Sequence, residues 1–214
     1  MVKIGVLRVL STDDENLLKL HGRLIEAAIG EVETLSRCIE GHPRGLWNEE
    51  EEARAIPKIV RLGREMAQEG VDALIVSCAD DPGVKELRDV LEIPVIGAGS
   101  AAAATALALG LPVGVLTISD FIPRPVEELL GERIVAFFRP EDVRTTLDLM
   151  TEESYRGFIS AGEKLVNCGA KVVLLACTGY STAGATKVLR AELNVPVIDP
   201  VVSAGFIAYQ MVKT

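Results

Sequence analysis

Two of the four cysteines occupy matching places in an internal repeat. The segments Gly70–Cys78 (GVDALIVSC) and Gly169–Cys177 (GAKVVLLAC) align without a gap and end on cysteine. A similar phrase follows each, LRDVLEIPVIG at 87–97 and LRAELNVPVID at 189–199. A thiolate can accept a proton from a carbon acid, and a helix N-terminus next to the thiol favours its ionised form. The repeat therefore predicts a pair of acid–base groups, one from each half of the chain.

Two thiols that face one ligand from opposite sides suit a racemisation. One thiolate removes a proton from a stereocentre, and a thiol returns a proton to the other face. A pseudo-symmetric protein also matches a substrate and product that are mirror images. We predict that Cys78 and Cys177 are this pair, whereas Cys38 and Cys168 have no counterpart in the repeat and are interpreted as structural.

The elements that position the cysteines can be predicted from alternating patterns. The predicted strands are Val2–Val9, Glu31–Ile39, Val71–Ser77, Pro94–Ile96, Pro112–Ile118, Arg133–Phe138, Lys171–Ala176 and Pro196–Ile198. The helical patterns between them cover 14–29, 57–69, 83–91, 126–130, 152–167, 183–193 and 201–212, and an Ala-rich helix lies within 93–119. This alternation predicts an α/β fold of two pseudo-symmetric flavodoxin-like lobes with parallel sheets, with the active site in the interlobe cleft.

We expect the first lobe to comprise residues 1–97 plus 200–214 and the second lobe to comprise residues 98–199. Both cysteines end an apolar strand pattern, and ligands of such sheets bind outside the carboxyl ends of the strands.

Composition excludes several classes of function. The 214 residues include 22 Lys and Arg against 31 Asp and Glu, and the net charge of −9 with 4% aromatic residues disfavours nucleic-acid binding. Only two histidines are present and no CxxC pair occurs, so we predict no metal site. The uncharged stretch 93–119 is rich in Ala and Gly and is interrupted by Pro94 and Pro112, which disfavours a membrane span. Without an export signal at its start, the chain is expected to be cytoplasmic with free thiols, and to form a homo-oligomer that acts on a small molecule.

Around the paired cysteines the chain resembles the aspartate/glutamate/hydantoin racemase family, and its hydantoin racemase branch most closely. The first cysteine segment, Cys78-Ala79-Asp80-Asp81-Pro82-Gly83, is similar to the Cys-x-x-Asp-Pro-Gly phrase of that branch. The second, Cys177-Thr178-Gly179, is similar to the Cys-Thr or Cys-Ala-Gly phrase of the family. Further resemblance lies in Ser36–Gly41, in Val115–Thr117 and in Val195–Asp199.

The resemblance implies a cofactor-independent racemase in which Cys78 and Cys177 transfer the proton. It also implies the residues that line the substrate pocket. These are Ala79, Asp80, Thr117, Ser119, Thr178 and Gly179.

The chain departs from the family pattern after its first strand. Arg8-Val9-Leu10-Ser11-Thr12 stands where the hydantoin branch has Asn-Pro-Asn, so Ser11 is the expected replacement, and Arg8 is a second candidate that would suit a carboxylate. The first cysteine loop also lacks the Cys-Asn-Thr of amino-acid racemases, which favours 5-substituted hydantoins as substrates. An amino-acid racemase, a single-cysteine diacid isomerase or decarboxylase, and a small-molecule binding module remain as alternatives.

Overall fold

The computed structural model describes residues 1–213, and its contacts divide the chain into two compact units. The first unit contains Met1–Ala98 and the C-terminal segment from Val201, and the second contains Gly99–Pro200. No helix within residues 1–213 is long and apolar enough to cross a membrane.

The first unit is built on a parallel sheet of order β2-β1-β3-β4. Its strands are β1 (Val2–Arg8), β2 (Val32–Cys38), β3 (Ala73–Ser77) and β4 (Val95–Gly97). In this order β1 and β3 are neighbours, and Arg8 is in register with Cys38 on one side and with Ser77 on the other. The strands that precede the first cysteine and the Ser11 loop therefore end side by side.

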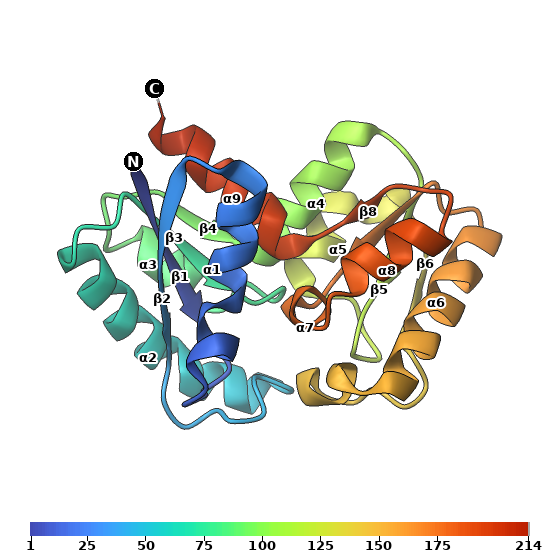
Figure 1. Ribbon diagram of the computed structural model, residues 1–214, viewed down its shortest axis with the longest axis horizontal. Coiled ribbons are helices and arrows are strands. Elements are labelled where there is room, and N and C mark those ends of the chain that lie inside the picture. Colours follow the sequence, from blue (N-terminus) through green and yellow to red (C-terminus); the bar gives the residue numbers. More distant parts are fainter. Residues whose placement is uncertain (214) are drawn as a thin grey trace. The chain divides into compact units, whose positions relative to one another are not determined.

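Helices cover both faces of this sheet (Figure 1). The helices of the first unit are α1 (Glu15–Ile29), α2 (Glu49–Gln68), α3 (Val84–Arg88) and α9 (Pro200–Val212). The apolar residues of α2 and α3 pack with Leu7, Leu74 and Val76 in one core cluster. On the other face α1 lies so close to β2 that a Cβ atom at Gly22 would stand 2.2 Å from Oγ1 of Thr34, which only glycine allows.

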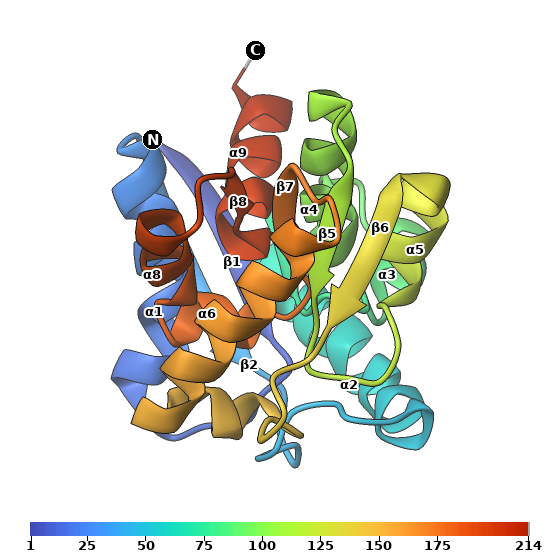
Figure 2. The ribbon, with the colours of Figure 1, turned by 90° about the vertical axis from the view of Figure 1, so that its right-hand side faces the viewer.

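The second unit repeats the same plan. Its sheet has the order β6-β5-β7-β8 and is parallel throughout, with strands β5 (Val113–Leu116), β6 (Ile134–Phe138), β7 (Val172–Leu175) and β8 (Val197–Ile198). Side chains of α4 (Ala98–Leu109) and α5 (Arg124–Leu130) pack in one core cluster, and those of α6 (Glu152–Asn167) and α8 (Ala185–Glu192) pack in another. Figure 2 shows the ribbons of these helices together with the strands of the sheet. The predicted α/β fold of two lobes with parallel sheets is confirmed.

Three short helical elements complete the second unit, and the sequence patterns did not predict them. They are the 3₁₀ turns η1 (Gly131–Arg133) and η2 (Thr146–Met150) and the short helix α7 (Thr178–Thr182). The helix predicted over 183–193 begins at Ala185, because Gly184 has a φ of +69° and interrupts it.

One helix start was predicted wrongly. The helical pattern was predicted to cover 57–69, but α2 begins at Glu49 and continues through Pro57. Asn48 caps this helix by accepting a hydrogen bond from the amide of Glu51, and four glutamates occupy the first turn, where the helix dipole favours negative charge.

Candidate functional site

The predicted site residues of the first unit lie at the carboxyl edge of its sheet. Cys78 directly follows β3, and the loop from Cys78 to Gly83 leads into α3. The amide of Cys78 donates to the Val76 carbonyl at 3.0 Å, and the Cys78 carbonyl accepts from the amide of Asp81 at 3.3 Å. Cys78 is half-buried and packs against the apolar cluster beneath α2. The thiol is therefore presented by a short, internally bonded turn.

Asp80 belongs to the same turn and carries a perturbed carboxyl group. It accepts no hydrogen bond from any other residue in the described part of the chain. Burial, together with the negative charges of Glu52 and Asp81, raises the pKa of Asp80 from 3.8 to about 6. Ala79, the residue between Cys78 and Asp80, is buried.

Ser11 has a role in holding two loops together. Its hydroxyl donates to the Ile39 carbonyl at 2.6 Å and accepts from the amide of His42 at 2.7 Å. Ser11 also donates its own amide to the His42 carbonyl at 3.0 Å. These bonds use the hydroxyl proton of Ser11, so a substrate could only donate to its remaining lone pair.

Arg8 ends β1 beneath α1 and is 3% exposed. Its guanidinium donates to the Leu17 carbonyl in the first turn of α1. Burial lowers the pKa of Arg8 from 12.5 to about 10, and the nearby Cys38 opposes this change. Arg8 is thus still a cation at neutral pH, and it forms no ion pair with a carboxylate within residues 1–213.

Sequence reasoning missed a buried histidine behind the first cysteine. His21 of α1 is 0% exposed, and its Nδ1 lies 2.7 Å from Oγ of Ser77, the residue before Cys78. A lone histidine in a helical pattern carries no signal for such a contact, because the partner comes from a distant strand.

The predicted site residues of the second unit gather at the corresponding edge. Cys177 follows β7 after Ala176 and caps the N-terminus of α7. Its Sγ accepts the amide N–H of Gly179 at 3.3 Å, which favours negative charge on the sulfur. Thr178 and Gly179 form the first turn of α7 and are both buried.

Gly179 is required by close packing. A Cβ atom at this position would lie 2.5 Å from Cγ2 of Thr146 and 2.8 Å from Cδ1 of Leu149. The turn η2 therefore packs directly against α7. This packing brings Oγ1 of Thr146 to 4.0 Å from Sγ of Cys177. Thr146 was not among the predicted site residues, since it falls between recognisable patterns and reaches Cys177 only through the tertiary fold.

Thr117 is buried after β5 and organises its loop rather than offering free groups. Its hydroxyl donates to the Phe121 carbonyl at 3.2 Å and accepts the amide of Ser119 at 3.1 Å. Its carbonyl accepts the hydroxyl of Tyr180 at 2.8 Å, which links this loop to α7. Burial, assisted by the charge of Cys177, raises the pKa of Tyr180 well above its ordinary value, so Tyr180 stays a neutral donor. The hydroxyl of Ser119 forms no hydrogen bond with another residue of the described chain.

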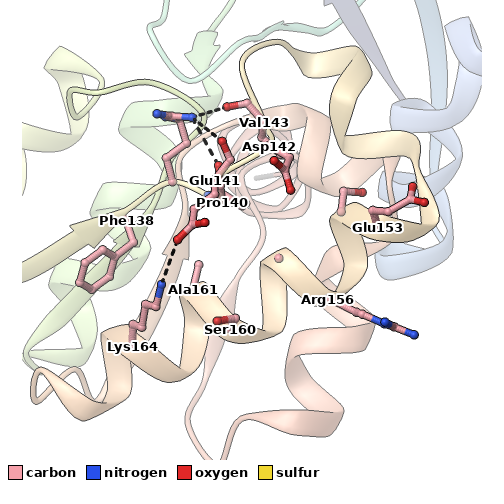
Figure 3. A pocket seen from close by; sticks show the side chains of 13 residues that line it. Phe138, Pro140, Glu141, Asp142, Val143, Glu153, Arg156, Ser160, Ala161 and Lys164 are labelled. Atoms are coloured by element: carbon pink, nitrogen blue, oxygen red, sulfur yellow. Dashed lines mark hydrogen bonds and ion pairs between the residues drawn. The ribbon is translucent and has the colours of Figure 1, made fainter.

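A separate cavity of about 300 Å³ lies in the second unit between the 138–143 loop and α6 (Figure 3). Glu141 and Lys164 pair along its wall, with 3.9 Å between Oε1 and Nζ. None of the predicted site residues lines this cavity. Its charged side chains include Arg139, which is bonded to its own loop by donation to the Val143 carbonyl at 2.6 Å.

Metal-ligand clusters are absent from the part of the chain that the structure describes: no three His, Cys, Asp or Glu residues are grouped so that they could hold an ion. The groups described above at the two sheet edges are thiols, a carboxyl group, hydroxyls and backbone amides.

Residues 22–204 match the family model described as Asp/Glu/Hydantoin racemase. The chain belongs to this racemase family. A hydantoin racemase from Pseudomonas sp. (strain NS671) is 29% identical over 168 residues, which cover 75% of this chain and 66% of the relative. A hydantoin racemase from Rhizobium meliloti is 29% identical over 175 residues, covering 76% of this chain and 69% of the relative. The racemase domain described here thus spans about two thirds of the length of these curated relatives.

The fold of this racemase-family chain is also that of a solved racemase. Allantoin racemase from Klebsiella pneumoniae superposes with a TM-score of 0.82 at 24% identity, covering 99% of this chain and 88% of that one. The resemblance to the aspartate/glutamate/hydantoin racemase family that the paired cysteines suggested is confirmed, as is the closeness to hydantoin racemases.

Proposed function

We propose that this protein is a cofactor-independent racemase of 5-substituted hydantoins, with Cys78 and Cys177 as the proton-transfer pair. The observation that carries the proposal is the equivalent place of the two thiols. Each follows the third strand of a 2-1-3-4 parallel sheet, Cys78 after β3 and Cys177 after β7. Such a place, next to the strand-order switch, is where open α/β sheets bind ligands.

The reaction needs one cysteine as thiolate and the other as thiol. The thiolate takes the proton from the substituted ring carbon, and the electron pair moves into the adjacent carbonyl as an enolate. The thiol then delivers its proton to the opposite face of the same carbon, so the inverted product leaves with the two cysteines in exchanged protonation states. Backbone N–H groups at the two sheet edges can stabilise the enolate oxygen.

A hydantoin is preferred to an amino acid for two reasons. The curated relatives reported above are hydantoin racemases, and the Cys78–Gly83 segment resembles that branch. The charge of the Cys78 loop also favours a neutral substrate ring. The carboxylates of Glu52 and Asp81 lie near Asp80, and these negative charges would repel a substrate that has an acidic side chain.

The test is α-proton exchange and optical rotation in D₂O with separate D- and L-hydantoins. Cys78→Ser and Cys177→Ser should each lower racemisation by about 100-fold or more, the usual cost of removing a general acid–base group. Cys168→Ser is the matched control, because Cys168 is exposed at the end of α6, and it should leave the rate unchanged.

Other outcomes would replace the proposal in defined ways. Exchange of aspartate or glutamate without exchange of hydantoins would make the protein an amino-acid racemase. Loss of activity in only one of the variants Cys78→Ser and Cys177→Ser would indicate single-cysteine isomerase or decarboxylase chemistry. If no compound in the panel exchanges its proton, the protein is better described as a binding module.

A further inference from the structure

We propose that Thr146 is the hydrogen-bonding partner of the Cys177 thiol and controls only the half-reaction that Cys177 performs. The contact is a property of the second unit alone. Its catalytic consequence rests on the proposed function, in which each thiol acts on one enantiomer.

An amide and a hydroxyl of the second unit approach the sulfur of Cys177. The amide N–H of Gly179 lies 3.3 Å from Sγ, and the hydroxyl oxygen of Thr146 lies 4.0 Å from it. An amide can only donate, whereas a hydroxyl can donate or accept. Thr146 can therefore donate to the sulfur when it is a thiolate and accept the S–H when it is a thiol. A racemase that works in both directions needs both protonation states of the same cysteine.

The position of Thr146 is fixed by its surroundings. Its Cγ2 methyl fills the space that a side chain at residue 179 would need, 2.5 Å from the Cβ position there. The turn η2 begins with a capping box, in which Thr145 and Asp148 satisfy each other's backbone amides. The hydroxyl of Ser154 in α6 lies 2.8 Å from the Leu149 carbonyl and 2.6 Å from the Thr151 carbonyl, so its one proton is shared between the end of η2 and the start of α6.

The side chain of Arg139 also stabilises the loop that leads to η2. Arg139 donates through Nη1 to the Val143 carbonyl at 2.6 Å and pairs with Asp120 at 2.9 Å. The Arg139 side chain is 16% exposed, whereas its ion-pair partner Asp120 is 86% exposed, so the bond to the Val143 carbonyl is the better shielded of the two. The same loop lines the cavity shown in Figure 3, and Arg139 is one of the lining residues. The fold thus builds a support for the residue that touches Cys177.

The first test measures the reactivity of the two thiols with pH in the absence of substrate. Each cysteine is alkylated with iodoacetamide across a pH series, and the extent is measured separately for the Cys78 and Cys177 peptides by mass spectrometry. Thr146→Val keeps the packing methyl but loses the hydroxyl, so the alkylation midpoint of Cys177 should rise by about one pH unit, as expected for the loss of a hydrogen bond to a charged group. The midpoint of Cys78 should not move.

The second test measures the α-proton exchange of each half-reaction separately. In a Cys78→Ser background, the remaining Cys177 exchanges the α-proton of one hydantoin enantiomer with D₂O, and Thr146→Val should slow this exchange by about tenfold. In a Cys177→Ser background, Cys78 exchanges the other enantiomer, and Thr146→Val should leave that rate unchanged. Thr146→Ser retains the hydroxyl and should recover most of the Cys177 exchange.

Leu147→Ala is the matched control, because Leu147 is a neighbour in η2 with 42% of its surface exposed. It should leave both alkylation midpoints and both exchange rates unchanged. The inference is overturned if Thr146→Val moves neither thiol, if it affects Cys78 and Cys177 equally, or if Leu147→Ala has the same effect. A shifted Cys177 midpoint without any hydantoin exchange in the wild type would keep the contact and reject the proposed function.

Discussion

The sulfur of Cys177 accepts an amide N–H from the first turn of α7, while Cys78 lies in a turn that is closed by its own backbone. The two repeated cysteines therefore have different local surroundings although they follow equivalent strands. Thr146 adds to this difference, because it belongs to η2, and the loop after β6 that carries it continues into α6. Under the proposed function, such a difference would favour one thiol as the base and the other as the acid at rest.

Asp80 gives a prediction of pH-dependent stability. A carboxyl group with a higher pKa in the folded than in the unfolded protein opposes folding where it is ionised. With a folded pKa of about 6 against 3.8, ionised Asp80 lowers the free energy of unfolding above about pH 6, and this loss vanishes as the pH falls below 3.8. Asp80→Asn should therefore raise the melting temperature at pH 8, and the gain should shrink steadily between pH 7 and pH 4.

The measurement is thermal unfolding of the wild type and the variant across this pH range. Asp142→Asn, an exposed position in the β6–η2 loop, is the control and should change the melting temperature little at any pH. A constant difference between wild type and Asp80→Asn from pH 4 to pH 8 would contradict the electrostatic explanation.

At the scale of elements, the start of α2 determines what surrounds the first cysteine loop. The Asn48 side chain accepts the amide of Glu51 at 2.8 Å and so begins the helix that carries Glu52 toward Asp80. Asn48→Ala should lower the free energy of unfolding by about 1 kcal/mol, the typical cost of losing an N-cap. Urea unfolding of the wild type and of Asn48→Ala would measure this difference in the free energy of unfolding.

Asn16→Ala provides the comparison for this cap. Asn16 is exposed in the first turn of α1, and its side-chain oxygen accepts from the guanidinium of Arg23 at 3.3 Å. Its substitution should change the free energy of unfolding by less than about 0.5 kcal/mol, as is usual for surface positions. Equal losses for the two variants would argue that the Asn48 cap contributes nothing specific.

At the scale of the whole molecule, the two units have the same sheet topology. Both units have the strand order 2-1-3-4, and in each the residue that carries a thiol follows the third strand. Proton transfer between thiols and a carbon acid needs no metal ion. Under the proposed function, hydantoin racemisation should therefore survive dialysis against EDTA without loss.

The check compares the exchange rate in D₂O before dialysis, after dialysis, and after addition of Zn²⁺ or Mn²⁺. Treatment with iodoacetamide serves as the positive control for inactivation, because it blocks the thiols. A loss of activity on dialysis that a divalent ion restores would show that the thiol pair alone does not carry the reaction.

The sequence by itself determined the family, the α/β architecture and the equivalence of Cys78 and Cys177. These follow from local patterns: buried parallel strands are apolar throughout, and a repeated segment places the same residue at the same strand end. The helix over 152–167 was predicted with its observed bounds, because its apolar positions recur at helical spacing.

Only the tertiary structure decided which side chains meet at those strand ends. Thr146 reaches Cys177 across 31 positions, and His21 reaches Ser77 across 56, so no local pattern records either contact. The hydroxyl of Ser11 was predicted for substrate binding, yet the fold directs its proton to the Ile39 carbonyl, 28 positions away. Burial and neighbouring charge likewise set the pKa of Asp80, since both depend on what packs around a carboxyl group rather than on its place in the chain.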